Sequence, residues 1–322
     1  MMEIYGTLGP ACAQGAILEQ MFRCGMTGLR LNLSHTSLEE SAPLLEQMHL
    51  AAERCGVRPQ LLIDLQGPEL RVGKQGLPLL LEEGVRLPLR RLALPEHLYA
   101  ALQPETELLL DDGRLCVRVL PAGEGLVLRG GTLAPGKSVA VPGLCAALPA
   151  LTAADRKNLS LASAFGVTGV MQSFVRSRED VEEVRTALCG TGLRHFAKLE
   201  NRAGLDSLEQ WIRLPDVLVI ARGDLGNAVP LWELPGVQKQ VAARARQAGK
   251  PFLVVTQMLA SMERTAVPTR AEVSDIFNAV LDGASALMLT GETAAGRYPA
   301  EAMDYFCRTI RAAEAFLREE RN

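Results

Sequence analysis

Two features that nucleic-acid-binding proteins usually show are missing from this sequence. Aromatic residues make up 4% of the 322 residues, and the Lys and Arg residues form no long run. Proteins that bind nucleic acid usually combine a basic patch with aromatic side chains that stack on bases. Because the formal net charge is −3, we expect no nucleic-acid partner.

Long apolar runs and paired cysteines are also missing. No stretch approaches the roughly 18 apolar residues of a membrane-spanning helix, so we expect no membrane partner. The seven cysteines are scattered, with no CxxC pair, which argues against a disulfide framework or a zinc site. The opening MMEIYGTLGP lacks the basic and apolar parts of a secretory signal. We therefore expect a cytoplasmic protein with reduced thiols.

Short apolar runs alternate with amphipathic stretches along the chain. The runs are rich in Val, Ile and Leu, as parallel strands buried on both faces are. They lie at 3–8, 28–33, 60–65, 169–174, 194–199, 216–221, 251–256 and 286–291. Eight strand–helix units predict an α/β fold, a closed (β/α)8 TIM barrel. An open doubly wound sheet is the alternative, but GTLGPACAQG matches its Gly-rich turn poorly.

The connection between the third and fourth predicted strands is far longer than ordinary loops. It contains β-like segments separated by Gly and Pro, at 86–90, 107–113, 114–120, 125–130 and 137–143. We predict a small inserted β-barrel lid domain at 73–143, after strand 3, and a barrel formed by 1–72 and 144–322. A last helix at 298–318 completes the eighth unit, so we expect no C-terminal regulatory domain.

Polar residues gather at the C-terminal ends of the predicted strands, where barrel active sites form. Lys198 and Glu200 belong to the fifth strand and its end, and being two residues apart they face the same side. Asp224 follows the neighbouring sixth strand, so the two carboxylates can share Mg²⁺ or Mn²⁺. A lysine beside such an ion suits a transferring phosphoryl group. The alternative is two separate surface acids and a lysine in a salt bridge.

The glycine-rich turn at 223–226 adds a second element to this predicted site. A Gly-Asp-Leu-Gly turn after a strand can open a short helix with free N–H groups. Such groups bind a carboxylate or phosphate. Next to Glu200 and Asp224, the turn indicates a site for a small acid that chelates a metal ion.

These segments resemble pyruvate kinase along nearly the whole chain. The motifs that carry the resemblance, in the family's order, are GTLGPAC, GLRLNLSH, GPELR, DDG, LPALTAADR, SFVR, AKLEN, ARGDLG, TQML and PTRAEVSDIFNAVLDGASALMLTGETAAGRYP. The resemblance implies transfer of phosphate from phosphoenolpyruvate to ADP, giving pyruvate and ATP. It also implies Mg²⁺ or Mn²⁺, K⁺ in members that need it, and a homo-oligomer formed through the barrel.

The resemblance also implies a role for each matching position. Catalytic roles fall to Lys198, Arg30, Thr256 and Arg71. Glu200 and Asp224 match the Mg²⁺ ligands, and the K⁺ ligands are matched by Asn32, Ser34, Asp64 and Leu65. The substrate site is matched by Gly223, Asp224, Thr256 and Lys198. The nucleotide side is matched by Arg30, His35, Asp112 and Lys137.

Three departures from the family pattern lie near the predicted nucleotide and K⁺ sites. Where the family reads D-T-K-G-P-E, this chain has Leu65 without a hydroxyl and Gln66 without a charge, and Ala295 replaces a lysine in GETAKG. We therefore weigh three functions: a pyruvate kinase without sugar-phosphate allostery, a Mg²⁺-dependent lyase or aldolase acting on a pyruvate-like enolate, and a non-catalytic phosphoenolpyruvate-binding sensor.

Overall fold

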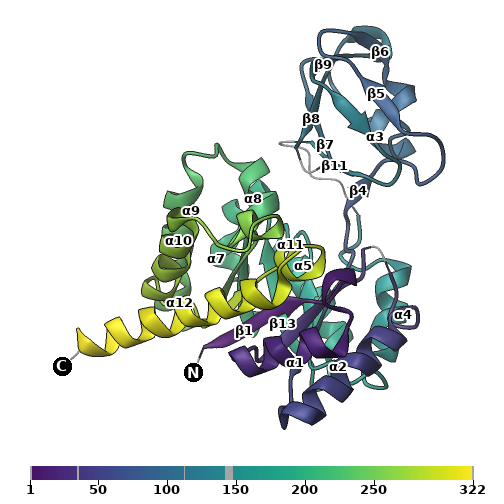
Figure 1. Ribbon diagram of the computed structural model, residues 1–322. Coiled ribbons are helices and arrows are strands. Elements are labelled where there is room, and N and C mark those ends of the chain that lie inside the picture. The colour runs from purple at the N-terminus through teal and green to yellow at the C-terminus, as the bar shows by residue number, and fades with distance from the viewer. Residues whose placement is uncertain (1, 35, 112, 142–147, 321–322) are drawn as a thin grey trace.

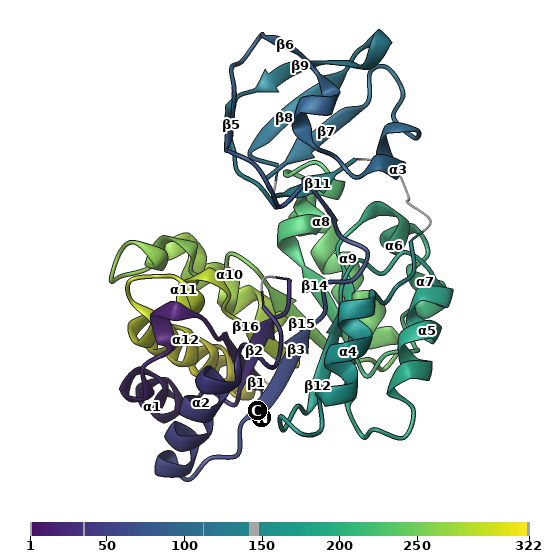
Figure 2. The ribbon, with the colours of Figure 1, turned by 90° about the vertical axis from the view of Figure 1, so that its right-hand side faces the viewer.

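A closed barrel of parallel strands forms the centre of the molecule (Figures 1 and 2). The computed structural model describes residues 2–34, 36–111, 113–141 and 148–320, with the side chain of His97 left aside. Within them the barrel strands are β1 (Glu3–Thr7), β2 (Gly28–Asn32), β3 (Gln60–Asp64), β12 (Gly169–Gln172), β13 (Arg194–Leu199), β14 (Val217–Ala221), β15 (Phe252–Val255) and β16 (Ala286–Met288). β1 closes the barrel by pairing with both β2 and β16. The predicted barrel is confirmed, and the open doubly wound sheet was the wrong alternative.

Helices cover the outside of the barrel. The longer ones are α1 (Gly15–Cys24), α2 (Ala42–Cys55), α4 (Ala153–Leu161), α5 (Arg178–Leu188), α9 (Leu234–Gln247), α10 (Arg270–Leu281) and α12 (Pro299–Glu319). Short helices are α6 (Arg202–Asp206), α7 (Leu208–Trp211), α8 (Arg222–Ala228) and α11 (Gly291–Ala294), and 3₁₀ turns are η1 (Pro10–Cys12) and η4 (Ala260–Glu263). None of the described helices combines the length and the apolar character that crossing a membrane requires.

Local sequence signals set several helix ends. Thr152 and Asp155 form a capping box at the start of α4, each side chain bonding the other's backbone, which satisfies N–H groups that have no partner inside the helix. Gly249 and Gly283 follow α9 and α10 at φ +65° and +90°. Only glycine adopts this left-handed conformation without steric cost, so both helices stop there.

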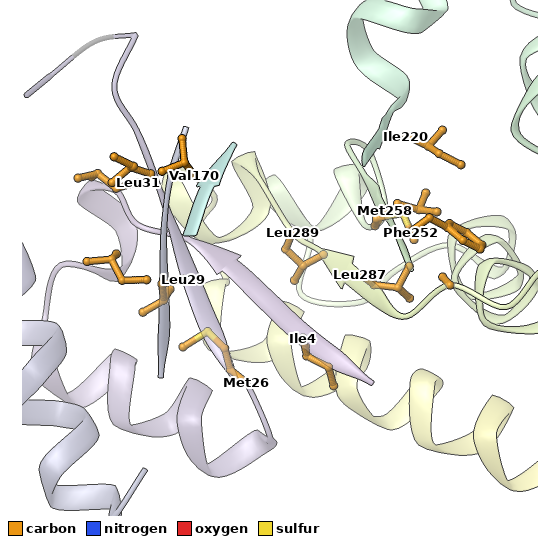
Figure 3. Packing of buried hydrophobic residues seen from close by; sticks show 14 of the residues in the cluster. Ile4, Met26, Leu29, Leu31, Val170, Ile220, Phe252, Met258, Leu287 and Leu289 are labelled. Carbon is orange, nitrogen blue, oxygen red and sulfur yellow. The ribbon is translucent and has the colours of Figure 1, made fainter. Parts of the chain in front are cut away.

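Alternation along the strands separates two apolar layers. One layer fills the barrel interior and includes Tyr5, Met171 and Phe196. The other lies between strands and helices, and Leu29 and Leu31 of β2 belong to it (Figure 3). Because side chains alternate along a strand, Arg30 between these two leucines faces the interior. Burial of each leucine contributes about 1.5–3 kcal/mol, which fixes the strand's register and the direction of Arg30.

An inserted β domain, here residues 70–141, stands over the C-terminal ends of the barrel strands (Figure 2). Its described strands are β4 (Leu70–Arg71), β5 (Leu79–Leu81), β6 (Arg86–Pro88), β7 (Glu107–Leu110), β8 (Leu115–Val119), β9 (Glu124–Arg129), β10 (Gly131–Leu133) and β11 (Ser138–Ala140). They form a sheet in the order β4-β11-β7-β8-β9-β6 and a ribbon of β5 and β10. The remaining elements are η2 (Leu89–Leu92), α3 (Glu96–Tyr99) and η3 (Pro121–Gly123).

The inserted domain has its own core, which includes Leu108, Val117 and Val127. The predicted segments 114–120 and 125–130 largely match β8 and β9, whereas 107–113 is extended only to Leu110. The segment 86–90 is extended only to Pro88, after which η2 begins, and proline lacks the N–H group that a strand ladder needs. The segment 137–143 is a strand at 138–140, and its residues 142–143 lie outside the described residues. The strands β4, β5 and β10 were not predicted. β4 pairs with β11, so the sheet starts just ahead of 73. The domain boundaries at 72/73 and 143/144 stay predictions.

Candidate active site

Four charged side chains meet at the mouth of the barrel. Asp64, at the end of β3, accepts a hydrogen bond on Oδ2 from Arg30 Nε of β2 at 2.8 Å, and Arg30 Nη2 forms an ion pair with the same oxygen at 2.7 Å. Lys198 Nζ of β13 lies 3.0 Å from Asp64 Oδ1 and 3.0 Å from Glu200 Oε1. Alternation and register therefore bring together Arg30, Asp64, Lys198 and Glu200, which we call the phosphoryl side after the role that the sequence predicts for it.

The phosphoryl side is buried and electrically balanced. Burial raises the pKa of Asp64, but Lys198 and Arg30 more than offset this and hold it below its ordinary value. Burial lowers the pKa of Lys198, yet Asp64 and Glu200 together raise it well above its ordinary value. An ammonium group so placed keeps its proton, so Lys198 suits charge stabilisation and not proton abstraction.

Two residues that follow β12 complete this cluster, and sequence reasoning gave neither a role. The Ser173 hydroxyl lies 2.6 Å from the Leu65 carbonyl oxygen and 3.1 Å from Asp64 Oδ1, and it can donate its proton to either. Phe174 has φ +55°, and its N–H donates to Glu200 Oε2 at 2.7 Å. The signal was the SFVR motif at a strand end, where polar groups converge.

Asp155 fixes the loop that leaves β3. Its carboxylate caps α4 and also accepts the backbone N–H groups of Gln66 at 2.9 Å and Gly67 at 3.1 Å. Asp155 is itself buried. Because these bonds use the backbone, the loop does not depend on the lysine that Gln66 replaces.

The two residues that follow β15 have a strained backbone conformation. Thr256 and Gln257 have φ +83° and +55°, and such a conformation costs about 1–3 kcal/mol per residue. Arg222 stabilises it by donating from Nη2 to the Thr256 carbonyl oxygen at 2.8 Å while pairing with Asp275 at 2.6 Å. A Cβ at Gly223 would lie 3.0 Å from Thr256 Cγ2. Strain that surrounding bonds maintain is typical of functional sites.

Glu200 and Asp224 are the predicted ligands of a divalent ion. They follow neighbouring strands, since Leu199 of β13 pairs with Ile220 of β14, and Asp224 lies in the first turn of α8. Carboxylate oxygens suit Mg²⁺ and Mn²⁺. The described residues hold no group of three or more His, Cys, Asp or Glu placed for a metal ion. The donor set thus fits an ion that takes its remaining oxygens from substrate and water.

The predicted K⁺ ligands fall into two hydrogen-bonded groups. Asn32 Oδ1 accepts the Ser34 N–H at 3.1 Å. Asp64 and the Leu65 carbonyl both meet Ser173. Leu65 is buried in the layer between strands and helices and offers only its backbone oxygen. The donor set fits K⁺ with one hydroxyl fewer than the family pattern has.

The remaining predicted residues connect the barrel to the inserted domain. Arg71 Nε bonds Glu69 Oε2 at 2.8 Å, and its Nη1 donates to the Gly136 carbonyl oxygen at 2.8 Å. Burial raises the pKa of Glu69 although Arg71 opposes it, and Lys198 and Glu200 also act on this carboxyl group. Glu69 and Arg71 therefore border the phosphoryl side.

The predicted nucleotide residues are placed only in part. Lys137 Nζ lies 2.7 Å from Asp111 Oδ1, and the lysine side chain is 41% exposed. The ion pair has the distance of a hydrogen bond but not its angle. His35 and Asp112 lie outside the described residues. Of the four residues predicted to face the nucleotide, the structure describes Arg30, paired with Asp64, and Lys137, paired with Asp111.

Comparisons with known proteins show the family of the chain. The family model "Pyruvate kinase, barrel domain" matches residues 1–88 and 92–303. The chain belongs to the pyruvate kinase family. A pyruvate kinase of Methylorubrum extorquens is 39% identical over 97% of this chain and 68% of its own length. Those of Aeropyrum pernix and Mycobacterium tuberculosis are each 38% identical, over 95% and 97% of this chain and 69% and 70% of theirs. The chain thus spans about two thirds of these pyruvate kinases.

Proposed function

We propose that this chain transfers the phosphoryl group of phosphoenolpyruvate to ADP, giving pyruvate and ATP. The observation that carries the proposal is the buried phosphoryl side, where Lys198 is held protonated between Asp64 and Glu200. A fixed cation in a site that excludes water stabilises charge that develops during reaction. Membership of the pyruvate kinase family supports the same conclusion.

The reaction breaks the bond between phosphorus and the enol oxygen and forms one to an oxygen of the ADP β-phosphate. Arg30 and Lys198 would bind oxygens of the phosphoryl group, since guanidinium and ammonium groups are its usual partners. Lys198 would then face the enolate oxygen. A proton must reach the enolate carbon to give the methyl group of pyruvate, and we place Thr256 on that route.

Glu200 and Asp224 would hold Mg²⁺ or Mn²⁺, which when bound neutralises negative charge on the reacting oxygens. The backbone at Gly223 and Asp224 would bind the substrate carboxylate. Asn32, Ser34, Asp64 and Leu65 would hold K⁺, weakened by the missing hydroxyl. Arg30, His35, Asp112 and Lys137 would face the nucleotide. Arg71, bonded to Glu69 and Gly136, would position the inserted domain beside the site.

A second candidate is a Mg²⁺-dependent lyase that acts on a pyruvate-like enolate. The observation that favours it is the loss of groups from one side of the site: Leu65 has no hydroxyl, and Gln66 and Ala295 carry no charge. Such an enzyme would keep Lys198, Glu200 and Asp224. A cytoplasmic location, a homo-oligomer and the absence of sugar-phosphate activation stay predictions. A sigmoidal rate curve that depends on a sugar phosphate would contradict the last.

The deciding experiment measures pyruvate formation from phosphoenolpyruvate with Mg²⁺, with and without ADP and with and without K⁺. Turnover that requires ADP and disappears in Lys198→Met supports the kinase. Metal-dependent turnover of a 2-oxo acid without nucleotide would favour the lyase. Binding of phosphoenolpyruvate or oxalate through Mg²⁺ without any product would contradict both enzymes and favour a sensor.

A further inference from the structure

A turn of the inserted domain touches the barrel at α8. Between β7 and β8 the structure describes Asp111, Gly113 and Arg114, here called the β7–β8 turn, and the Arg114 N–H donates to the Asp111 carbonyl oxygen at 3.1 Å. Gly113 has φ +78°, and a Cβ there would lie 2.6 Å from Asn227 Oδ1. Real Cβ contacts are not this short, so with any other residue at 113 either the Asn227 side chain or the turn would have to move. Figure 2 places α8 directly beneath the inserted domain.

The turn is firmly attached to the rest of the inserted domain. Asp111 is 8% exposed, and its N–H donates to the Ser138 carbonyl oxygen at 3.1 Å. Its carboxylate pairs with Lys137 at 2.7 Å. Ser138 begins β11 and Lys137 directly precedes it, and β11 lies between β4 and β7 in the sheet. A contact at Gly113 therefore fixes the position of the whole sheet of the inserted domain.

The barrel side of the contact belongs to the helix that carries the predicted site. Asp224 and Asn227 are three residues apart on α8, and residues at this spacing lie on one face of a helix. Gly223, at the start of the same helix, packs against Thr256. Gly113 thus meets α8 about one helical turn from Asp224.

We propose that Asn227 is a positioning residue, and that its contact with Gly113 docks the inserted domain over the active site. A Cβ at position 113 would force the Asn227 side chain and the turn apart, and loss of the Asn227 amide would remove the same contact from the barrel side. For its kinetic consequences the proposal rests on the proposed function. Docking itself is tested without any activity.

The chain offers a matched control for Gly113→Ala. Gly123, in the same domain, has φ +76°, and nothing lies within 4 Å of a Cβ placed there. Gly113→Ala and Gly123→Ala therefore share the same backbone strain, and only the first meets Asn227. Asn227→Ala removes the contact from the barrel side, and the double variant Gly113→Ala/Asn227→Ala completes a double-mutant cycle.

Docking can be measured by hydrogen exchange at the backbone amides of residues 222–228, which form α8. In Gly113→Ala we expect about tenfold faster exchange there than in Gly123→Ala, because a lost contact releases local opening. Asn227→Ala alone should also speed exchange in this segment, and the double variant should exchange no faster than Gly113→Ala, because both changes remove the same contact. Thermal unfolding checks that each variant is folded. Equal exchange in Gly113→Ala and Gly123→Ala, or additive effects in the double variant, would overturn the proposal.

Kinetics add the functional consequence. We expect Gly113→Ala to raise the KM for ADP and lower kcat together by about tenfold, because misplacement of about 1 Å near a site is costly, while Gly123→Ala stays near the wild type. A faster exchange with unchanged kinetics would overturn positioning but leave the contact. If the wild type shows no kinase activity, the proposed function fails, and the exchange data still decide the docking.

Discussion

The two sides of the barrel mouth differ in how firmly their charges are held. On the phosphoryl side, the Lys198 side chain is 10% exposed and contacts two buried carboxylates. On the side of the inserted domain, the Lys137 side chain is 41% exposed and pairs with Asp111. Removal of one partner from a buried ion pair destabilises a protein by about 3–5 kcal/mol, whereas an exposed pair contributes little. Under the proposed function, the groups that act on phosphoenolpyruvate are fixed in the barrel, while binding of the acceptor depends on where the inserted domain lies.

The largest effect is expected from removal of the Lys198 ammonium group, which tests whether the phosphoryl side is catalytic. Lys198→Met should lower kcat by about 10³-fold, the scale of losing one preorganised charge that stabilises a transition state. The measurement is pyruvate formation with ADP and Mg²⁺. Lys239→Met is the matched control, because Lys239 is an exposed lysine that pairs with Asp282. Comparable activity in the two variants would mean that the phosphoryl side is structural.

His195, a buried histidine of the strand that carries Lys198, predicts that the free energy of unfolding depends on pH. Burial lowers the pKa of His195 to about 4, with Asp216 opposing and Arg185 assisting the shift. His195 Nε2 lies 2.8 Å from Gln172 Oε1, and Gln172 in turn donates to the Asp180 carbonyl oxygen at 2.9 Å. This pair ties β12 and β13, the strands that lead to Ser173 and Lys198, to α5.

The sign follows from proton uptake. Below about pH 6.5 the unfolded chain binds a proton at this histidine that the folded chain does not bind until about pH 4. The free energy of unfolding therefore has its full contribution from the neutral His195 above pH 6.5. As the pH falls from 6.5 toward 4, this contribution is lost, by about 3 kcal/mol in total. Urea unfolding at several pH values measures it. His195→Gln should flatten this part of the profile, and an unchanged slope in that variant would contradict the assignment.

A smaller effect should follow removal of the hydroxyl at Ser173. Ser173→Ala takes a hydrogen bond from Asp64 or the Leu65 carbonyl, and losing such a buried partner costs about 1–3 kcal/mol. We expect kcat to fall about tenfold, since Asp64 orients both Arg30 and Lys198. Ser160→Ala, which removes an exposed hydroxyl bonded to the Lys157 carbonyl oxygen, should leave kcat unchanged. Equal kinetics in the two alanine variants would remove Ser173 from the site.

The phosphoryl side could be predicted from sequence because it depends on two simple regularities. Side chains alternate along strands, and strand ends of a closed barrel meet at one rim. Arg30, Asp64 and Lys198 each occupy an inward position near such an end, so their convergence follows from the strand assignments.

The rest depends on geometry that the sequence does not display. Phe174 contributes a backbone N–H, and Thr256 and Gln257 are strained by φ values that only the folded loops impose. The partner of Lys137 is known only once β7 and β11 pair. In the same way, the contact of Gly113 with Asn227 joins two domains through a glycine that looks like any turn glycine in sequence.

The smallest expected effect restores a charge at a position that the family resemblance predicts to lie near the nucleotide. Ala295 is exposed after α11, so a lysine there meets no packing constraint. We expect Ala295→Lys to lower the KM for ADP about threefold and leave the KM for phosphoenolpyruvate unchanged, since one exposed charge contributes about 0.2–1 kcal/mol. The gain should shrink as salt rises, because exposed charges are screened. Ala295→Gln controls for side-chain length. Equal effects of Lys and Gln, or a lower KM for phosphoenolpyruvate, would mean that position 295 does not face the nucleotide.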